Sequence, residues 1–273
     1  MDLRLRQVAL VARSKADTVA ALSAVLDLKP VHGSGNLAPY GLPAEGPMTE
    51  AGKRVLETLG VENLLFAVGS DFIEVMFPTR PDGATVGFMD RRGGDTGYMV
   101  ILQTDDVDRF ALLAEKQDVR ITHRGQFPNY QDIHLHPRDC GGALLSMAKH
   151  LPVNVPDGSW YPAGTVWETS HASTAVSAIV AAEMRSADPE ALARRWARLL
   201  DKSVRQDGAF WTIALDDGVL RFGLLAEGQR EGFCGLDVKV RDRSRIEQGA
   251  QEFGVAIADD IVPICGVAIR LVE

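Results

Sequence analysis

The hydrophobic pattern first shows a short apolar run followed by a helix with one apolar face. Residues 7–12 read QVALVA, a run that favours a β-strand. Ser14 and Asp17 then resemble a capping box, in which side chains accept the free backbone N–H groups of a first helical turn. The apolar positions of the next segment recur at helical spacing: Val19, Leu22 and Leu26. The pattern therefore predicts a strand, a cap and an amphipathic helix.

The same order returns three more times along the chain. The further opening strands are predicted at residues 98–102, 179–184 and 236–240, each followed by aspartates at a helix start: Asp105 and Asp106, Asp188, and Asp242. Pro189 stands in a first helical turn, where its missing N–H costs nothing, and Gly254 stands where a helix should stop. A repeated strand–cap–helix unit indicates a repeat architecture.

Each predicted helix is followed by short extended segments and a closing strand, which gives the order βαβββ four times. The closing strands are predicted at 71–77, 142–147, 218–224 and 266–272. Residues 151–174 are rich in proline and have few periodic apolar positions, so they read as a connection. The expected domains are 1–150 and 175–273. Since short links favour adjacency, module one should pair with two and three with four.

Composition narrows the class of protein. The 273 residues are 46% hydrophobic and 24% charged, as in a soluble globular protein, and the net charge of −8 argues against nucleic acid as a partner. The three cysteines are far apart, so a disulfide framework is not expected. No apolar run approaches the ~20 residues of a membrane span, and residues 1–17 lack a signal-peptide pattern. A cytoplasmic protein without membrane partners is expected, as a monomer or a homodimer.

Two segments resemble a known superfamily. The segment 134–147, HLHPRDCGGALLSM, resembles the closing hairpin of vicinal-oxygen-chelate (glyoxalase and bleomycin-resistance) proteins, especially the methylmalonyl-CoA epimerase branch. The segment 99–108, MVILQTDDVD, is similar to the opening of the second module in that branch. The resemblance implies an α+β fold in which four βαβββ modules pair into two cup-shaped, glyoxalase-like half-barrels.

In this superfamily two opening and two closing strands each direct one ligand at a divalent metal. The matching positions here are Gln7, Met99, Glu74 and Ser146. Met99 is a soft thioether and Ser146 a weak donor, so no tightly bound metal is expected, although weak binding of a divalent ion by Gln7 and Glu74 stays open. No cofactor is therefore predicted.

The second half has Ala181, Gly235, Arg221 and Arg270 at the matching positions. With these residues the second half lacks the His, His, Glu iron site of an extradiol dioxygenase. The two arginines could clamp an anionic ligand. The alternative is that they are solvated or ion-paired structural residues, and it is the favoured one.

Glu74 is the candidate general base of the first cup. Its neighbours Phe72 and Met76 share its face of the strand, and an apolar environment raises the pKa of a carboxyl group. The alternative is a structural pair with Gln7 or an arginine. His134 is a candidate catalytic residue together with Gln7. His134 and His136 are two apart on an extended segment and should share a face, whereas His32, His123, His150 and His171 show no partner in the sequence.

Further polar and sulfur side chains are candidates for binding a substrate near the cup. The predicted substrate-binding residues are Met99, Ser146, His136, Arg91, Tyr98 and Gln103. Arg91 belongs to the polar segment 90–103, which could seat a carboxylate or a phosphate of coenzyme A, or could simply be a charged turn. The aromatic residues of the connection, Trp160, Tyr161 and Trp167, could line the cup or pack the two halves together.

Two functions remain open from the sequence. The first is a metal-independent enzyme of isomerase or lyase type that moves a proton on a small carbonyl or carboxylate substrate, with acyl-CoA thioesters among the candidates. The second is a non-catalytic protein that sequesters a small molecule, as the antibiotic-resistance members of the superfamily do. In either case the expected partner is a small molecule.

Overall fold

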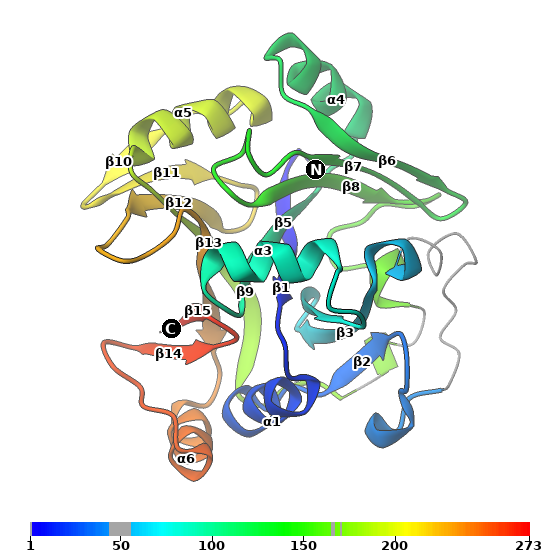
Figure 1. Ribbon diagram of the computed structural model, residues 1–273, viewed down its shortest axis with the longest axis vertical. Helices are drawn as coiled ribbons and strands as arrows, with labels where there is room; N and C mark the ends of the chain where they lie inside the picture. The colour runs from blue at the N-terminus through cyan, green and yellow to red at the C-terminus, as the bar shows by residue number, and fades with distance from the viewer. Residues whose placement is uncertain (1, 44–55, 165–166, 170) are drawn as a thin grey trace.

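The order of elements repeats four times along the chain (Figure 1). The structure is a computed structural model, and it describes residues 2–43, 56–164, 167–169 and 171–273. Within each copy the first strand lies parallel to the last. The first copy consists of β1 (Arg4–Val11), α1 (Lys15–Leu26), β2 (Pro30–Gly33), β3 (Val61–Val68) and β4 (Asp71–Pro78), and the second of β5 (Thr96–Gln103), α4 (Val107–Lys116), β6 (Ile121–Phe127), β7 (Tyr130–Leu135) and β8 (Leu144–His150).

The second half repeats this plan with one shortened copy. In the fourth copy an isolated bridge between Ala258 and Ile261 stands in place of a further strand. The third copy consists of β9 (Val176–Ser186), α5 (Pro189–Leu200), β10 (Arg205–Asp207), β11 (Phe210–Ala214) and β12 (Val219–Leu224), and the fourth of β13 (Gly232–Val240), α6 (Arg243–Phe253), β14 (Ile261–Ile264) and β15 (Val267–Val272). An additional helix, α3 (Ala84–Arg92), joins the first two copies.

Two curled sheets follow from the pairing of these copies. The first sheet has the order β2-β3-β4-β1-β5-β8-β7-β6, and the second has the order β10-β11-β12-β9-β13-β15-β14. The predicted pairing of copy one with two and of three with four is confirmed. So is the α+β, glyoxalase-like fold.

The local signals read from the sequence explain where the helices begin and end. Ser14 accepts the backbone N–H of Asp17 at 3.2 Å, and Asp106, Asp188 and Asp242 cap the other three repeat helices in the same way. Gly254 ends α6 with a φ of 76°, a conformation that glycine adopts without strain. These caps fix the joints at which each strand gives way to its helix.

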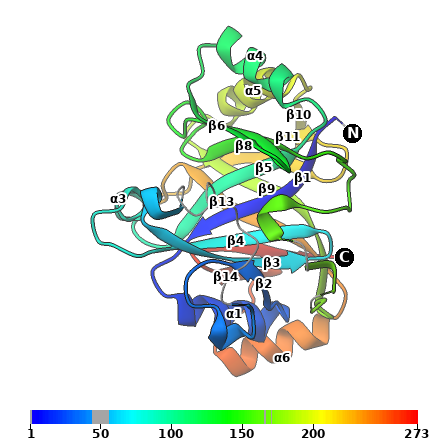
Figure 2. The same cartoon turned by 90° about the vertical axis from the view of Figure 1, so that its right-hand side faces the viewer.

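One continuous apolar core joins the two halves. Apolar side chains of both sheets and of the repeat helices belong to a single cluster, and α1 packs against α6 as α4 does against α5 (Figure 2). Gly249 of α6 makes the first of these contacts possible, since a Cβ there would lie 1.8 Å from the carbonyl oxygen of Ala24. Gly97 of β5 likewise lies against the backbone of Phe233 on β13. The halves therefore form one packed body.

The connection between the halves covers the face of the first sheet that is turned away from the shared core. Trp160 and Trp167 belong to the apolar cluster on this face, so they pack into the first cup as one of the two readings of the sequence expected. Arg6 is completely buried beneath them and donates to the carbonyl oxygens of Pro156 and Gly158, and its burial lowers its pKa to about 10. Arg6 thus anchors the connection over the cup.

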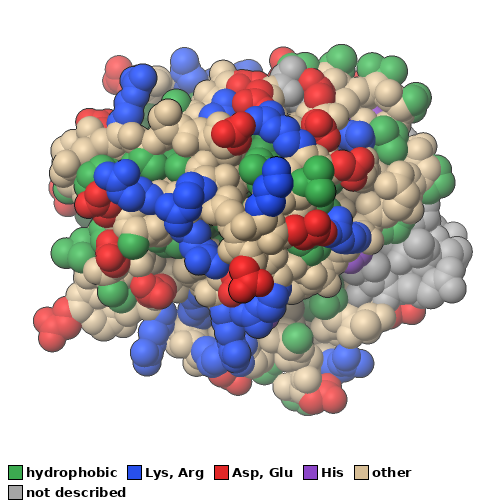
Figure 3. Space-filling view, turned by 90° about the horizontal axis from the view of Figure 1, so that it is seen from above, with side chains coloured by type: hydrophobic (Ala, Val, Ile, Leu, Met, Phe, Trp, Pro, Cys, Tyr) green, Lys and Arg blue, Asp and Glu red, His purple; other side chains and the backbone are tan. Residues whose placement is uncertain are grey.

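The surface is mixed in charge where Figure 3 shows it. On this face, seen from the side of α4 and α5, lysine and arginine side chains are interspersed with aspartate and glutamate. Within the described ranges, every helix is too short or too polar to span a lipid bilayer.

Candidate functional site

The four superfamily ligand positions lie on one face of the first sheet, here called the cup face. Glu74, Gln7, Met99 and Ser146 stand on the neighbouring strands β4, β1, β5 and β8, respectively, and alternation along each strand sets them on the same side. Phe72 and Met76 share the face with Glu74, as predicted.

Glu74 accepts a hydrogen bond on each carboxylate oxygen. The side-chain amide of Gln7 donates to Oε2 and that of Asn63 donates to Oε1, both at 2.8 Å. Gln7 in turn accepts the indole N–H of Trp160 at 2.7 Å, and Asn63 accepts the hydroxyl of Ser34 at 2.8 Å. Since the oxygen of each amide is already held by a donor, each amide must turn its NH₂ group toward Glu74.

The position of Glu74 makes its carboxylate more basic than usual. Burial raises its pKa above the ordinary value, and the two amide donors and the charge of nearby His134 lower it by less. The side chain keeps some exposure, so it is not sealed from a ligand. Burial, with the charge of Glu74, also raises the pKa of Tyr98.

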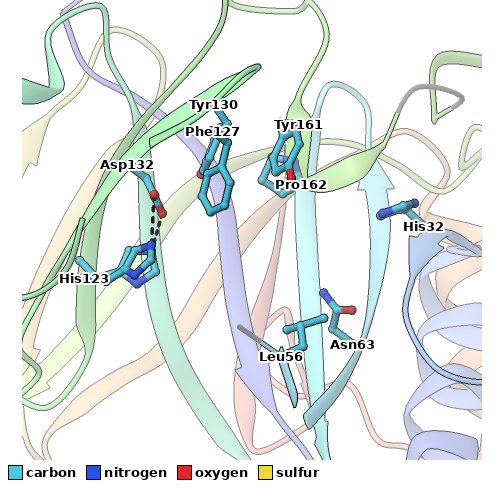
Figure 4. A pocket seen from close by; sticks show the side chains of 10 residues that line it. His32, Leu56, Asn63, His123, Phe127, Tyr130, Asp132, Tyr161 and Pro162 are labelled. Carbon is cyan, nitrogen blue, oxygen red and sulfur yellow. Dashed lines mark ion pairs between the residues drawn. The ribbon is translucent and has the colours of Figure 1, made fainter. Parts of the chain in front are cut away.

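A cavity of about 160 Å³ opens beside this network, between the two edges of the curled first sheet (Figure 4). Asn63 links the two, because it lines the cavity and donates to Glu74. The wall is largely aromatic: Tyr161 stacks on Tyr130 at 5.4 Å and on Phe127 at 5.7 Å between ring centroids. The other lining residues are His32, Leu56, His123, Asp132, His134 and Pro162.

Three of the lining residues form a compact polar cluster on the hairpin β6–β7. Asp132 lies 2.7 Å from Nε2 of His134 and 3.4 Å from Nε2 of His123, and the two imidazole rings are 4.6 Å apart between centroids. The close contacts with the two histidines hold the pKa of Asp132 well below its usual range despite its burial. His134 is thus oriented by Asp132, while its charge acts on Glu74.

The predicted substrate-binding residues divide between the cup face and other places. Met99 and Ser146 are buried on the cup face, and Ser146 lies opposite His134 in the register of β7 and β8. Tyr98 packs edge-on to Phe88 at 5.0 Å, at the border of the apolar cluster of the cup.

Of the other three predicted substrate-binding residues, two form hydrogen bonds within the protein and one is exposed. His136 lies beyond the end of β7, in a turn where its Nδ1 accepts the backbone N–H of Arg138. β7 ends at Leu135, so His136 is not part of the strand that carries His134. Arg91 is exposed at the end of α3. Gln103 is buried and donates to Asn154 of the connection at 2.8 Å.

The second sheet carries ion pairs where the first has its cup. Arg221 pairs with Asp237 and, at 3.1 Å, with Glu183, and Arg270 lies 3.8 Å from Asp237. Glu183 also binds Arg185 at 2.5 Å. The favoured interpretation of these arginines as ion-paired residues is confirmed.

Sequence reasoning missed Asn63, Asp132 and the role of His123. A signal for Asn63 was present: the two-residue turn Gly69–Ser70 sets the register of β3 and β4 and so places Asn63 on the face of Glu74. The two-residue turn Pro128–Asn129 likewise places His123 opposite His134.

Comparisons with known proteins bear on the fold. No protein-family model and no curated sequence matches the chain. It is similar to a hypothetical protein from Staphylococcus aureus, with 11% identity, 99% of both chains covered and a TM-score of 0.62. It is similar to a variant of 4-hydroxymandelate synthase from Streptomyces coelicolor, with 13% identity, 92% of this chain and 75% of that one covered, and a TM-score of 0.62. A methylmalonyl-CoA epimerase variant from Streptomyces coelicolor matches 56% of this chain and 98% of its own at 20% identity, with a TM-score of 0.43.

The two likenesses with a TM-score of 0.62 show the fold of the chain, which is glyoxalase-like. At 11% and 13% identity they say nothing about its chemistry.

Proposed function

We propose that the first cup is the active site of an enzyme in which Glu74 moves a proton on a small carbonyl or carboxylate substrate, as an isomerase or a lyase. The observation that carries this proposal is the hydrogen-bonded position of Glu74. Two amides of fixed orientation hold the carboxylate beside an aromatic cavity, and burial raises its pKa toward the range that suits a general base.

The network supports a role as proton acceptor. Each oxygen of Glu74 receives one N–H, which leaves lone pairs for a proton from the substrate. Gln7 is fully used in this arrangement, since its NH₂ group faces Glu74 and its oxygen faces Trp160. We therefore assign Gln7 to positioning Glu74, and not to the weak metal site that the sequence left open.

The cavity limits the size of the reacting group. Its volume of about 160 Å³ is far more than the ~15 Å³ that a single water molecule needs. It fits a small organic molecule, or the reacting end of a larger one such as an acyl-CoA thioester. His134, which lines the cavity and is oriented by Asp132, is the second group placed to contact the substrate.

Proton exchange in deuterated water tests this proposal. The purified chain is incubated with small 2-oxo acids, hydroxyketones and short acyl-CoA thioesters, and loss of the Cα–H signal is followed by proton NMR. We expect exchange with at least one compound, slowed about 10²–10⁴-fold by Glu74→Gln. Glu247→Gln is the matched control, because Glu247 is exposed on α6 in the second half, where it pairs with Arg243, and should leave exchange unchanged.

The alternative function has a different signature. A sequestering protein would be stabilised against heat by one of these compounds and would exchange no proton. Stabilisation without exchange, or exchange that Glu74→Gln leaves unaltered, would refute the proposed role of Glu74.

A further inference from the structure

We propose that His123, Asp132 and His134 form a binding site for a divalent first-row metal ion such as Zn²⁺, at the wall of the cavity. The possible ligand atoms of these three residues all lie within 4.8 Å of one another. They stand on β6 and β7, whereas the superfamily ligand positions stand on β1, β4, β5 and β8. The proposed site is therefore separate from them, and it does not depend on proton transfer by Glu74.

The register of the hairpin creates the cluster. His123 lies directly opposite His134, and Asp132 is two residues before His134 on the same face. Both imidazoles turn Nε2 toward the carboxylate of Asp132. Three side chains from two rigid strands thus converge without help from a loop.

Gly125 leaves the space in which the carboxylate lies. It is opposite Asp132 in the register, and a Cβ at this position would lie 1.9 Å from Oδ1 of Asp132 and 2.9 Å from Nε2 of His123. Asp132 is 5% exposed, and its buried Oδ1 has no hydrogen-bond partner. A cation held between this carboxylate and the two imidazoles would give the buried oxygen the partner that it lacks.

The donor set suits zinc and its neighbours in the first transition row. Two neutral imidazoles and one carboxylate are common ligands of such ions, and three protein ligands leave at least one position for a solvent or ligand oxygen. Since all three residues line the cavity, that open position faces the space where a small molecule would lie. The metal would take the place of the hydrogen that His134 now shares with Asp132, at 2.7 Å.

Metal titration of the chain without an affinity tag tests the site. After treatment with a chelator, the protein is titrated with Co²⁺, followed by its visible absorption, and with Zn²⁺ in a calorimeter. We expect one ion per chain, and binding weakened at least about 100-fold in His134→Ala and in Asp132→Ala. His136→Ala is the matched control, because His136 is two residues away in a turn and should bind the metal like the unaltered chain.

Gly125→Ala provides a test that keeps all three ligands. The added methyl group would push Asp132 out of its position, so we expect weaker binding with the fold retained, as checked by circular dichroism. Absence of saturable binding up to millimolar Co²⁺ and Zn²⁺, or equal affinity in His134→Ala and the unaltered chain, would overturn the proposal. The proton-exchange assay of Glu74→Gln is independent, so either proposal can fail alone.

Discussion

Replacing Glu74 by glutamine tests whether the side-chain amides of Gln7 and Asn63 are held in fixed orientations. The new side chain has nearly the same shape, but its nitrogen donates where a carboxylate oxygen accepted. Gln7 cannot turn its oxygen toward residue 74 without leaving the N–H of Trp160, which can only donate. Asn63 can turn its oxygen toward residue 74, because the hydroxyl of Ser34 can accept as well as donate, but the Ser34 hydroxyl then loses Asn63 as its acceptor. In Glu74→Gln both amides can therefore keep a hydrogen bond to residue 74 only if Asn63 reverses and gives up the hydrogen bond from Ser34. A protonated Glu74 avoids this conflict, because both of its oxygens still accept.

Two effects set the expected change in the free energy of unfolding: the variant leaves one hydrogen-bonding group unsatisfied, and it removes a buried charge. A buried donor without an acceptor costs about 1–3 kcal/mol, so Glu74→Gln should lower the free energy of unfolding by that amount near pH 4.5. The folded pKa of Glu74 is raised, which means that the folded state binds the proton more tightly than the unfolded state. The stability due to Glu74 is then complete below about pH 4.5 and declines as the pH rises through the folded pKa. The deficit of the variant should shrink toward pH 8.

Urea unfolding at several pH values between about 4.5 and 8 measures this difference for both proteins. A double-mutant cycle with Ser34→Ala isolates this contribution, because the hydrogen bond from Ser34 to Asn63 is then absent in both orientations of the amide. We expect the double variant to be more stable than the sum of the single effects by more than ~0.5 kcal/mol. Strict additivity, or a deficit that grows with pH, would refute the reasoning.

Three further variants test contacts outside the Glu74 network, each by urea unfolding. Arg6→Met leaves the carbonyl of Gly158 without its buried donor and should cost at least ~2 kcal/mol; an unchanged midpoint would show that Arg6 does not anchor the connection. Gly249→Ala should cost about 1–3 kcal/mol by driving α6 off the backbone of Ala24, and a neutral effect would contradict the close approach. Arg221→Met leaves Glu183 with Arg185 and Asp237 with the more distant Arg270, so it should cost about 1–3 kcal/mol, and an unchanged midpoint would contradict the ion pairing.

Much of the fold could be predicted because its signals are local. Aspartate caps, a first-turn proline and a terminal glycine mark each strand-to-helix joint, and all depend on residues within a few positions of one another. Strand alternation then placed Gln7 and Glu74 on one face. The joining helix α3 was missed, because its sequence, ATVGFMDRR, has no capping side chain before it and a glycine within it.

The polar partners of the site were harder to predict, because they depend on register across hairpins. His123 and Asp132 are nine residues apart in sequence, and only the turn at residues 128–129, which pairs their strands, brings them together. Trp160 reaches Gln7 over 153 residues, and nothing local predicts that contact. The turn that holds His136 was also not predicted, since the strand that carries His134 ends at Leu135.

The structural and catalytic interpretations of Glu74 are not exclusive. The amides that pair with Glu74 would satisfy a structural role, yet a neutral side chain could fill the same volume without the cost of placing a carboxylate in an apolar cup. Burial raises the pKa of Glu74 in spite of both donors, so the network only partly offsets that cost. Gln7 and Asn63 are themselves held from behind by Trp160 and Ser34, an arrangement that fixes the direction of the carboxylate lone pairs. A group that is costly to bury and fixed in direction meets the requirements of a proton acceptor, and the stability lost by holding it there is the trade expected at an active site.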